Sequence, residues 1–179
     1  MLRKLLLCAL AAALSLAIMQ AREPRPASQT AIPLPDGKKI RLQQYQGKVV
    51  VLAIFSTTCP DCVENIQMLN RVQKDLGPLG FQAIGAAGDD NAQYSIGSFV
   101  QRYKITFPIG YVNKDEMIAI GDIAPNRRPV APIFLFIDKN GVVRFQYYGD
   151  EPFFKTSDGS TRSIVQGLLK ESAKGARPH

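Results

Sequence analysis

The sequence predicts one α/β domain: a mixed sheet with helices on both faces, preceded by a short β-hairpin. Two observations carry this prediction. Buried strands alternate with amphipathic helices over residues 48–103, which requires a crossover between parallel strands. Two apolar strands over residues 133–148 flank the turn Asp138-Lys139-Asn140-Gly141, so the last pair is antiparallel. With 179 residues, 46% of them apolar, the chain has enough material for one good-sized core.

The first 21 residues have the plan of a signal peptide. Arg3 and Lys4 precede an apolar stretch from Leu5 to Ile18, after which the chain turns polar. This stretch falls short of the roughly 20 residues that span a bilayer, so we favour cleavage over an uncleaved membrane anchor. The cleavage site stays open between Ala17 and Ala21. Cleavage of this segment would remove Cys8. Export would place the other two cysteines, Cys59 and Cys62, in a compartment where disulfides persist.

The next segments precede the main sheet in the sequence. Residues 22–30 (REPRPASQT) contain two prolines and no apolar period, so we predict a flexible linker. The domain is expected over residues 31–173, followed by a flexible tail over 174–179. Asp36-Gly37 marks a turn between two short apolar segments, which predicts the small hairpin.

The centre of the domain follows the alternating pattern. Residues 48–55 are continuously apolar after Lys48, a run typical of a strand buried on both faces. A helix follows and ends at Gly77-Pro78. Its apolar face is Val63, Ile66, Leu69, Val72 and Leu76. A second strand (81–87), a second helix around Ile96–Tyr103, the antiparallel strands 133–137 and 142–148, and a closing helix over 160–173 complete the order.

The charge balance argues against nucleic-acid binding. The formal charge is +7, and loss of Arg3 and Lys4 would leave 20 basic against 15 acidic side chains. These basic residues are scattered, and no basic stripe interleaved with aromatics occurs. We therefore expect a solvated surface that does not bind nucleic acid. We also expect a monomer.

Cys59-Pro60-Asp61-Cys62 directly follows the first buried strand. Zinc binding needs about four ligands, and the only histidine is His179 at the chain end. Covalent haem attachment needs a histidine directly after Cys62, where Val63 stands. A purely structural disulfide would close a loop of two residues and stabilise little. We expect no metal and no cofactor.

Redox chemistry fits the position of the pair. Unpaired N–H groups and the helix dipole at a helix start stabilise a thiolate, which is the attacking species. Pro60 suits the first helical position. We predict that Cys59 is the nucleophile and Cys62 the resolving thiol, joined in a reversible Cys59–Cys62 disulfide. Asp61 favours the helix but opposes the Cys59 thiolate, so we expect a less acidic nucleophile than that of a strong oxidant.

Four segments resemble a known family: PLPDGKKIRLQQYQGKVVVLAIFSTTCPDC, FQAIGAAGDDN, ITFPI and VAPIFLFIDKNGVV. In this order they are similar to the exported TlpA/ResA-like branch of the thioredoxin superfamily, which is related to the redoxin and AhpC/TSA proteins. The resemblance covers residues 32–169. It implies a three-layer thioredoxin-like fold and an exported, periplasmic thiol-disulfide oxidoreductase that acts on protein disulfides. A membrane electron donor would recharge it, and cytochrome c maturation is one role of such relatives.

The resemblance also assigns residues. Pro132 matches the cis-proline that faces the cysteines, and the backbone of Ala131 before it would hydrogen-bond an extended substrate. An ordinary proline at a strand start is the alternative. Thr58, Pro60 and Asp61 are expected to complete the substrate contacts.

Three positions depart from the family pattern. Thr58 replaces a tryptophan, which makes the rim less apolar. Ala53 replaces a buried aspartate, and Asn65 replaces a glutamate that follows the second cysteine. Glu64 lies about 200° round the helix from Cys62 and is poorly placed to substitute. Without a carboxylate base, Cys62 should stay protonated and resolve the mixed disulfide slowly.

Three functions stay open from the sequence. A protein-disulfide reductase is the first. A peroxiredoxin-like peroxidase is the second: Ser56 fits the hydroxyl that such enzymes place three residues before their cysteine, but Leu52 stands where they have a proline. A non-catalytic module that binds extended peptides at Pro132 is the third, and the retention of both cysteines argues against it.

Overall fold

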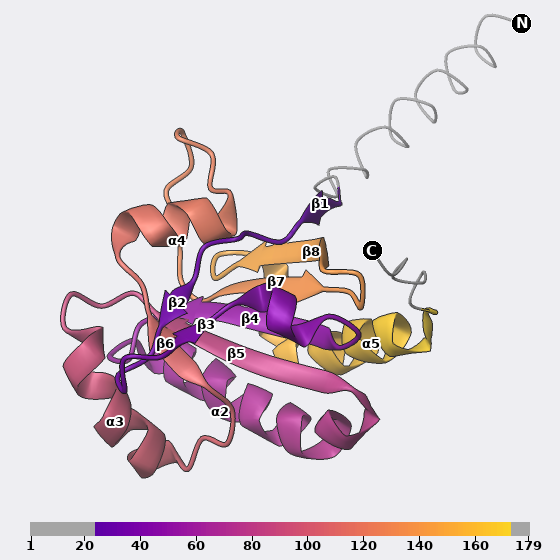
Figure 1. Ribbon diagram of the computed structural model, residues 1–179, viewed down its shortest axis with the longest axis horizontal. Coiled ribbons are helices and arrows are strands. Elements are labelled where there is room, and N and C mark those ends of the chain that lie inside the picture. The colour runs from indigo at the N-terminus through magenta and orange to yellow at the C-terminus, as the bar shows by residue number, and fades with distance from the viewer. Residues whose placement is uncertain (1–23, 173–179) are drawn as a thin grey trace, which may run out of the picture.

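A computed structural model describes residues 24–172 and confirms the predicted α/β class (Figure 1). The segment predicted as a leader and the predicted tail at 174–179 lie outside the described residues. Within residues 24–172, no helix combines the length and the apolar character needed to cross a membrane.

Six strands form one mixed sheet in the order β1-β8-β7-β4-β5-β6. Their bounds are Arg25–Pro26 (β1), Val49–Phe55 (β4), Phe81–Ala87 (β5), Ile109–Tyr111 (β6), Ile133–Ile137 (β7) and Val142–Tyr148 (β8). β4 pairs in parallel with β5, and β7 pairs antiparallel with both β4 and β8. The predicted crossover and the predicted closing hairpin are therefore both present.

The remaining elements cover this sheet. β2 (Ile32–Pro33) and β3 (Lys39–Ile40) pair antiparallel as the expected hairpin. The α-helices are α2 (Pro60–Leu76), α3 (Ala92–Tyr103), α4 (Lys114–Gly121) and α5 (Ser157–Lys170). Short 3₁₀ helices are η1 (Leu42–Tyr45), η2 (Gly77–Leu79) and η3 (Pro152–Thr156).

Strand β4 organises the core on both sides of the sheet. All seven of its residues are buried, and successive side chains point to opposite faces. Val49, Val51, Ala53 and Phe55 pack with α2, α3 and α5, whereas Val50, Leu52 and Ile54 pack with the hairpin and α4. Figure 1 shows α2 and α5 on one side of the sheet and α4 on the other, which gives three layers.

The segment predicted as a linker contributes to the sheet, which corrects the prediction for part of residues 22–30. Arg25 and Pro26 form β1 and pair with Val143 and Val142 of β8. The Arg25 guanidinium donates to the Gly121 carbonyl and the Gln146 side chain, and it lies 3.3 Å from a carboxylate oxygen of Asp122. A strand of two residues has no readable period, and tertiary contacts hold it in place.

Two other elements were not predicted. β6 has only three residues, and α4 exposes most of its surface. A capping box nevertheless marks the start of α4: the Asn113 side chain accepts from the Glu116 N–H, and the Glu116 side chain accepts from the Asn113 N–H. Helix α5 begins at Ser157, three residues before the predicted start.

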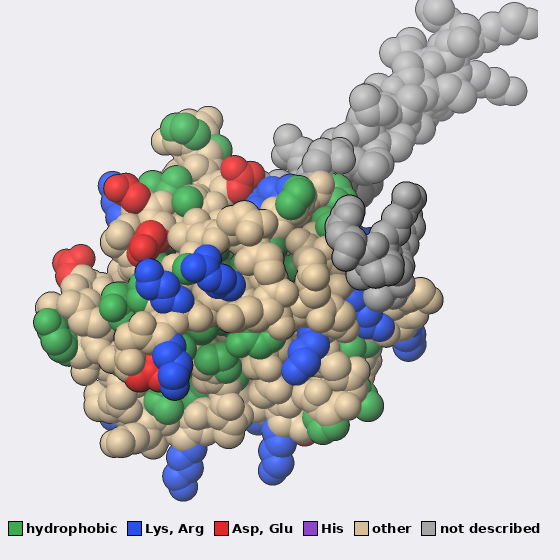
Figure 2. Space-filling model, viewed as in Figure 1, with side chains coloured by type: hydrophobic (Ala, Val, Ile, Leu, Met, Phe, Trp, Pro, Cys, Tyr) green, Lys and Arg blue, Asp and Glu red, His purple; other side chains and the backbone are tan. Residues whose placement is uncertain are grey.

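Figure 2 shows how the charged side chains are distributed on one face of the molecule. Lys and Arg side chains there are dispersed among polar and apolar groups rather than gathered into one patch.

Candidate active site

Cys59 lies where β4 has ended and helix α2 begins. It is the N-cap residue of α2, and Pro60 occupies the first turn. The Cys62 N–H donates to Cys59 Sγ over 3.4 Å. Cys59 is partly exposed, whereas Cys62 is fully buried one turn further on. The predicted geometry of an outer and an inner thiol at a helix start is therefore present.

Both cysteines are free thiols in this structure. Burial raises the pKa of Cys62 to about 12, and a hydrogen bond with Cys59 and the charge of Asp61 add smaller increases. A hydrogen bond with the Ser56 backbone acts in the opposite direction. Cys62 is thus protonated at neutral pH, as expected for a buried thiol without a base. The reversible Cys59–Cys62 disulfide stays a prediction.

Asp89 anchors the loop before the cysteines. Its carboxylate accepts a hydrogen bond from Ser56 Oγ and a second, of 2.7 Å, from the Thr57 N–H. The Thr58 N–H donates in turn to Ser56 Oγ over 3.3 Å. In the sequence, Asp89 stands two residues after the predicted strand over 81–87, and it was not predicted to be a site residue. The signal was available, because parallel strands β4 and β5 end at the same edge of the sheet.

Pro132 borders a cavity of about 320 Å³ beside α2, called here the Pro132 cavity. Its lining includes Asp61 and Asn65 of α2, and Gly149 after β8. The Ala131–Pro132 peptide bond is cis, as the resemblance implies. A Cβ on Gly149 would lie 2.4 Å from the Ala131 carbonyl oxygen, so only glycine permits this approach. That Ala131 and Pro132 hold substrate stays a prediction.

The predicted substrate contacts divide between two cavities. Asp61 and Pro132 line the Pro132 cavity, whereas Thr58 and Pro60 line a separate hollow of about 560 Å³. That hollow also contains Arg102 and Tyr103. Glu64 lines both cavities. The structure therefore gives Glu64 a position at the site that its angle from Cys62 did not suggest.

The surroundings of Asn65 were also not evident from the sequence. Its side chain is 7% exposed, and its amide N–H₂ donates to the Asp61 carbonyl over 2.8 Å. Its oxygen Oδ1 is buried without a hydrogen-bond partner. Because only the N–H₂ group can donate to a carbonyl, the unpartnered atom is an acceptor.

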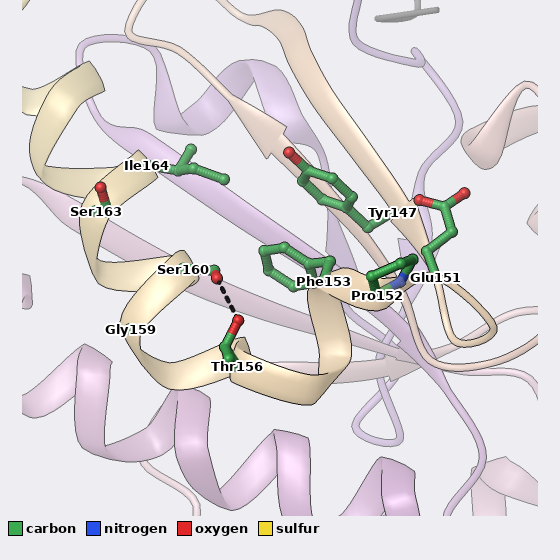
Figure 3. Close-up of a pocket in the computed structure, with 9 residues that line it drawn as sticks. All are labelled: Tyr147, Glu151, Pro152, Phe153, Thr156, Gly159, Ser160, Ser163 and Ile164. Carbon is green, nitrogen blue, oxygen red and sulfur yellow. Dashed lines mark hydrogen bonds between the residues drawn. The ribbon is translucent and has the colours of Figure 1, made fainter. Parts of the chain in front are cut away.

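A third cavity, of about 680 Å³, lies between the end of β8, η3 and the start of α5 (Figure 3). The rings of Tyr147 and Phe153 stack there with their centroids 4.1 Å apart. Its lining contains no cysteine, and Glu151 is the residue it shares with the Pro132 cavity. Among residues 24–172, no three His, Cys, Asp or Glu side chains are placed to hold a metal ion.

Comparison with known proteins identifies the family. The AhpC/TSA family model matches residues 25–146, which include both cysteines and Pro132. The chain belongs to the AhpC/TSA family. This assignment confirms the predicted membership of the thioredoxin superfamily and its TlpA/ResA-like branch.

Curated relatives of this AhpC/TSA-family chain are thiol-disulfide proteins. The chain is 26% identical over 136 residues to thiol-disulfide oxidoreductase ResA of Bacillus thuringiensis (strain Al Hakam), covering 76% of this chain and 70% of that protein. It is 30% identical over 105 residues to thiol:disulfide interchange protein DsbE of Escherichia coli (strain K12), covering 59% of this chain and 52% of that protein.

A solved structure supports the fold of this AhpC/TSA-family chain. A thioredoxin-family thiol:disulfide interchange protein from Chlorobium tepidum TLS superposes with a TM-score of 0.69 at 23% identity. The match covers 82% of this chain and 97% of that one. At this identity the likeness shows the fold alone, which is the three-layer thioredoxin-like arrangement.

Proposed function

We propose that the chain is an exported protein-disulfide reductase that works through a mixed disulfide on Cys59. The observation that carries the proposal is the contrast between the two thiols. Cys59 is partly exposed at the N-terminus of α2 and accepts the Cys62 N–H, while Cys62 is buried beneath it. Membership of a family of thiol-disulfide oxidoreductases supports the same chemistry.

The reaction proceeds in two exchange steps. The Cys59 thiolate attacks one sulfur of the substrate disulfide, which forms a Cys59–substrate disulfide and releases the other substrate sulfur as a thiolate. Cys62 then loses its proton and attacks Cys59 Sγ, which forms the Cys59–Cys62 disulfide and releases the second substrate thiol. Two electrons pass to the substrate, and a dithiol donor must return them to the enzyme.

The surroundings of the thiols favour a protein that reduces substrate disulfides over one that forms them. Burial raises the pKa of Cys62 and keeps that thiol protonated, and the Asp61 charge adds a smaller increase. A site that disfavours thiolates stabilises the reduced dithiol less than a strong oxidant does. We further propose periplasmic export, recharging by a membrane donor and action as a monomer. Residues 1–21 carry the export proposal, and they lie outside the described residues.

The test offers the reduced chain two oxidants in separate reactions: a protein disulfide and hydrogen peroxide. We expect consumption of the protein disulfide, with a Cys59–substrate adduct that accumulates in Cys62→Ser and is absent in Cys59→Ser. Faster consumption of peroxide would establish the peroxidase instead. A chain that consumes neither oxidant yet binds extended peptides would be the non-catalytic module. The equilibrium with glutathione then fixes the direction of electron flow.

A further inference from the structure

The Pro132 cavity is negatively charged in a chain that is positive overall. Four carboxylates belong to its lining: Asp61, Glu64, Asp150 and Glu151. Lys155 is the one basic residue among the lining residues. The formal charge of the whole chain is +7. The excess of acidic residues in the cavity lining is therefore opposite in sign to the net charge of the chain.

Internal ion pairs neutralise only half of these acids. Arg127 lies 2.9 Å from Glu151 and 3.5 Å from Asp150. Within residues 24–172, neither Asp61 nor Glu64 takes part in an ion pair. Both are exposed on the first turns of α2, within two residues of Cys62 in the sequence. The lining therefore keeps two uncompensated negative charges and one exposed lysine.

The cavity also contains an unused acceptor. Asn65 is 93% buried, and its Oδ1 has no partner, although its N–H₂ group is held by the Asp61 carbonyl. A buried carbonyl oxygen without a donor is costly, and native proteins normally satisfy it with water or a ligand. Because Asn65 belongs to the cavity lining, a hydrogen-bond donor bound in this cavity could supply the missing partner.

We propose that the Pro132 cavity binds a Lys or Arg side chain located next to the cysteine of the substrate disulfide. The N–H groups of such a side chain supply the donor for Asn65 Oδ1, and its charge faces Asp61 and Glu64. A volume of about 320 Å³ accommodates a single side chain rather than a folded element. The inference rests on the proposed function and narrows its substrates to disulfides with a basic neighbour.

The test compares disulfide-linked peptides that differ at one position. One pair has Lys or Met directly before the cysteine, and a second pair has Lys or Met directly after it. The measured quantity is the second-order rate constant of reduction by the full reduced chain, relative to the neutral disulfide of 2-mercaptoethanol. We expect the Lys peptide of at least one pair to react about tenfold faster than its Met partner, since a hydrogen-bonded charge contributes on this scale.

Four variants assign the preference to the cavity. Glu64→Gln and Asn65→Leu are expected to bring the Lys-to-Met ratio of rates close to one. Lys155→Met removes the competing cation and should raise the ratio. Asp115→Asn removes the same charge as Glu64→Gln but from α4, on the other side of the sheet, and should leave the ratio unchanged. An equal fall in Asp115→Asn and Glu64→Gln would reveal a general charge effect and overturn the inference.

Two further outcomes separate this inference from the proposed function. Reduction of the Lys and Met peptides at equal rates in both pairs would show that the chain is a reductase and that the cavity does not select basic neighbours. If neither the peptides nor the small disulfide is reduced, the proposed function itself is wrong, and the inference is wrong with it.

Discussion

The two thiols of Cys-Pro-Asp-Cys lie one helical turn apart and have opposite surroundings. Cys59 is partly exposed and receives an N–H from the helix start, while Cys62 is fully buried with a pKa of about 12. One sequence motif thus contains an accessible thiol that is placed to attack a substrate and a buried thiol that is protonated at neutral pH. The difference comes from the fold, because the same residue type occupies both positions. It predicts fast formation and slow release of the mixed disulfide.

The largest expected effect comes from removing either thiol. Cys59→Ser should abolish disulfide reduction, because no nucleophile remains at the exposed position. Cys62→Ser should retain the first attack and stop at the mixed disulfide. Mass spectrometry of the quenched reaction measures both results. Equal amounts of substrate adduct in the two variants would mean that the thiols do not have separate roles.

The pH dependence of the second step tests the Cys62 environment. Its raised pKa means that the attacking thiolate is scarce at neutral pH. From pH 7 to pH 10 the thiolate fraction, and with it the rate of release, should rise about tenfold per unit, since each unit below a pKa lowers the ionised fraction tenfold. Single-turnover decay of an isolated Cys59 mixed disulfide gives this rate. A plateau that begins at about pH 9 would show that Cys62 ionises as an ordinary thiol does.

A carboxylate placed near Cys62 should help to deprotonate this thiol and so accelerate release of the mixed disulfide. Asn65→Glu introduces a general base one turn from Cys62, and such bases accelerate proton transfer by about 10²-fold or more. Asn65→Gln is the matched control, with the same length and no charge. Release at pH 7 should accelerate in the glutamate variant only. Equal rates in the two variants would mean that proton removal does not limit the step.

The smallest effect should come from the loop that carries Cys59. Asp89→Asn weakens the hydrogen bonds to Ser56 and Thr57 and should lower the free energy of unfolding by about 1–3 kcal/mol. Urea denaturation measures this change. The attack by Cys59 should slow severalfold, while the pH profile of release stays unchanged. Asp90→Asn, at the exposed neighbouring position, is the control and should behave like the wild-type chain.

The sequence was most informative where packing follows a regular period. The strand over 48–55 and the helix after Cys59 were predicted from apolar spacing alone, because burial on one or two faces imposes that spacing. β1 was missed because its two residues are held by pairing with β8 and by the contacts of Arg25, which are distant in sequence.

The candidate site was predictable in part for a similar reason. Cys59, Cys62 and Pro132 stand in motifs, so the sequence alone indicates each of them. Asn65 was read as a missing acid, and its role as a buried acceptor depends on Asp61 and on a cavity wall that includes Gly149. Asp89 is 30 residues from Cys59, and only the parallel pairing of β4 with β5 brings its carboxylate to the cysteine loop.

Strand β1 determines where the chain enters the domain. Arg25 aligns with Val143, Val143 with Ile137, and Ile137 with Val50, so β1 lies level with the first residues of β4. The dithiol follows the last residue of that strand, roughly 17 Å further along at about 3.3 Å per residue. The described chain therefore enters the domain at the end of the sheet opposite to the dithiol, so an approaching protein can reach Cys59 without meeting that entry point.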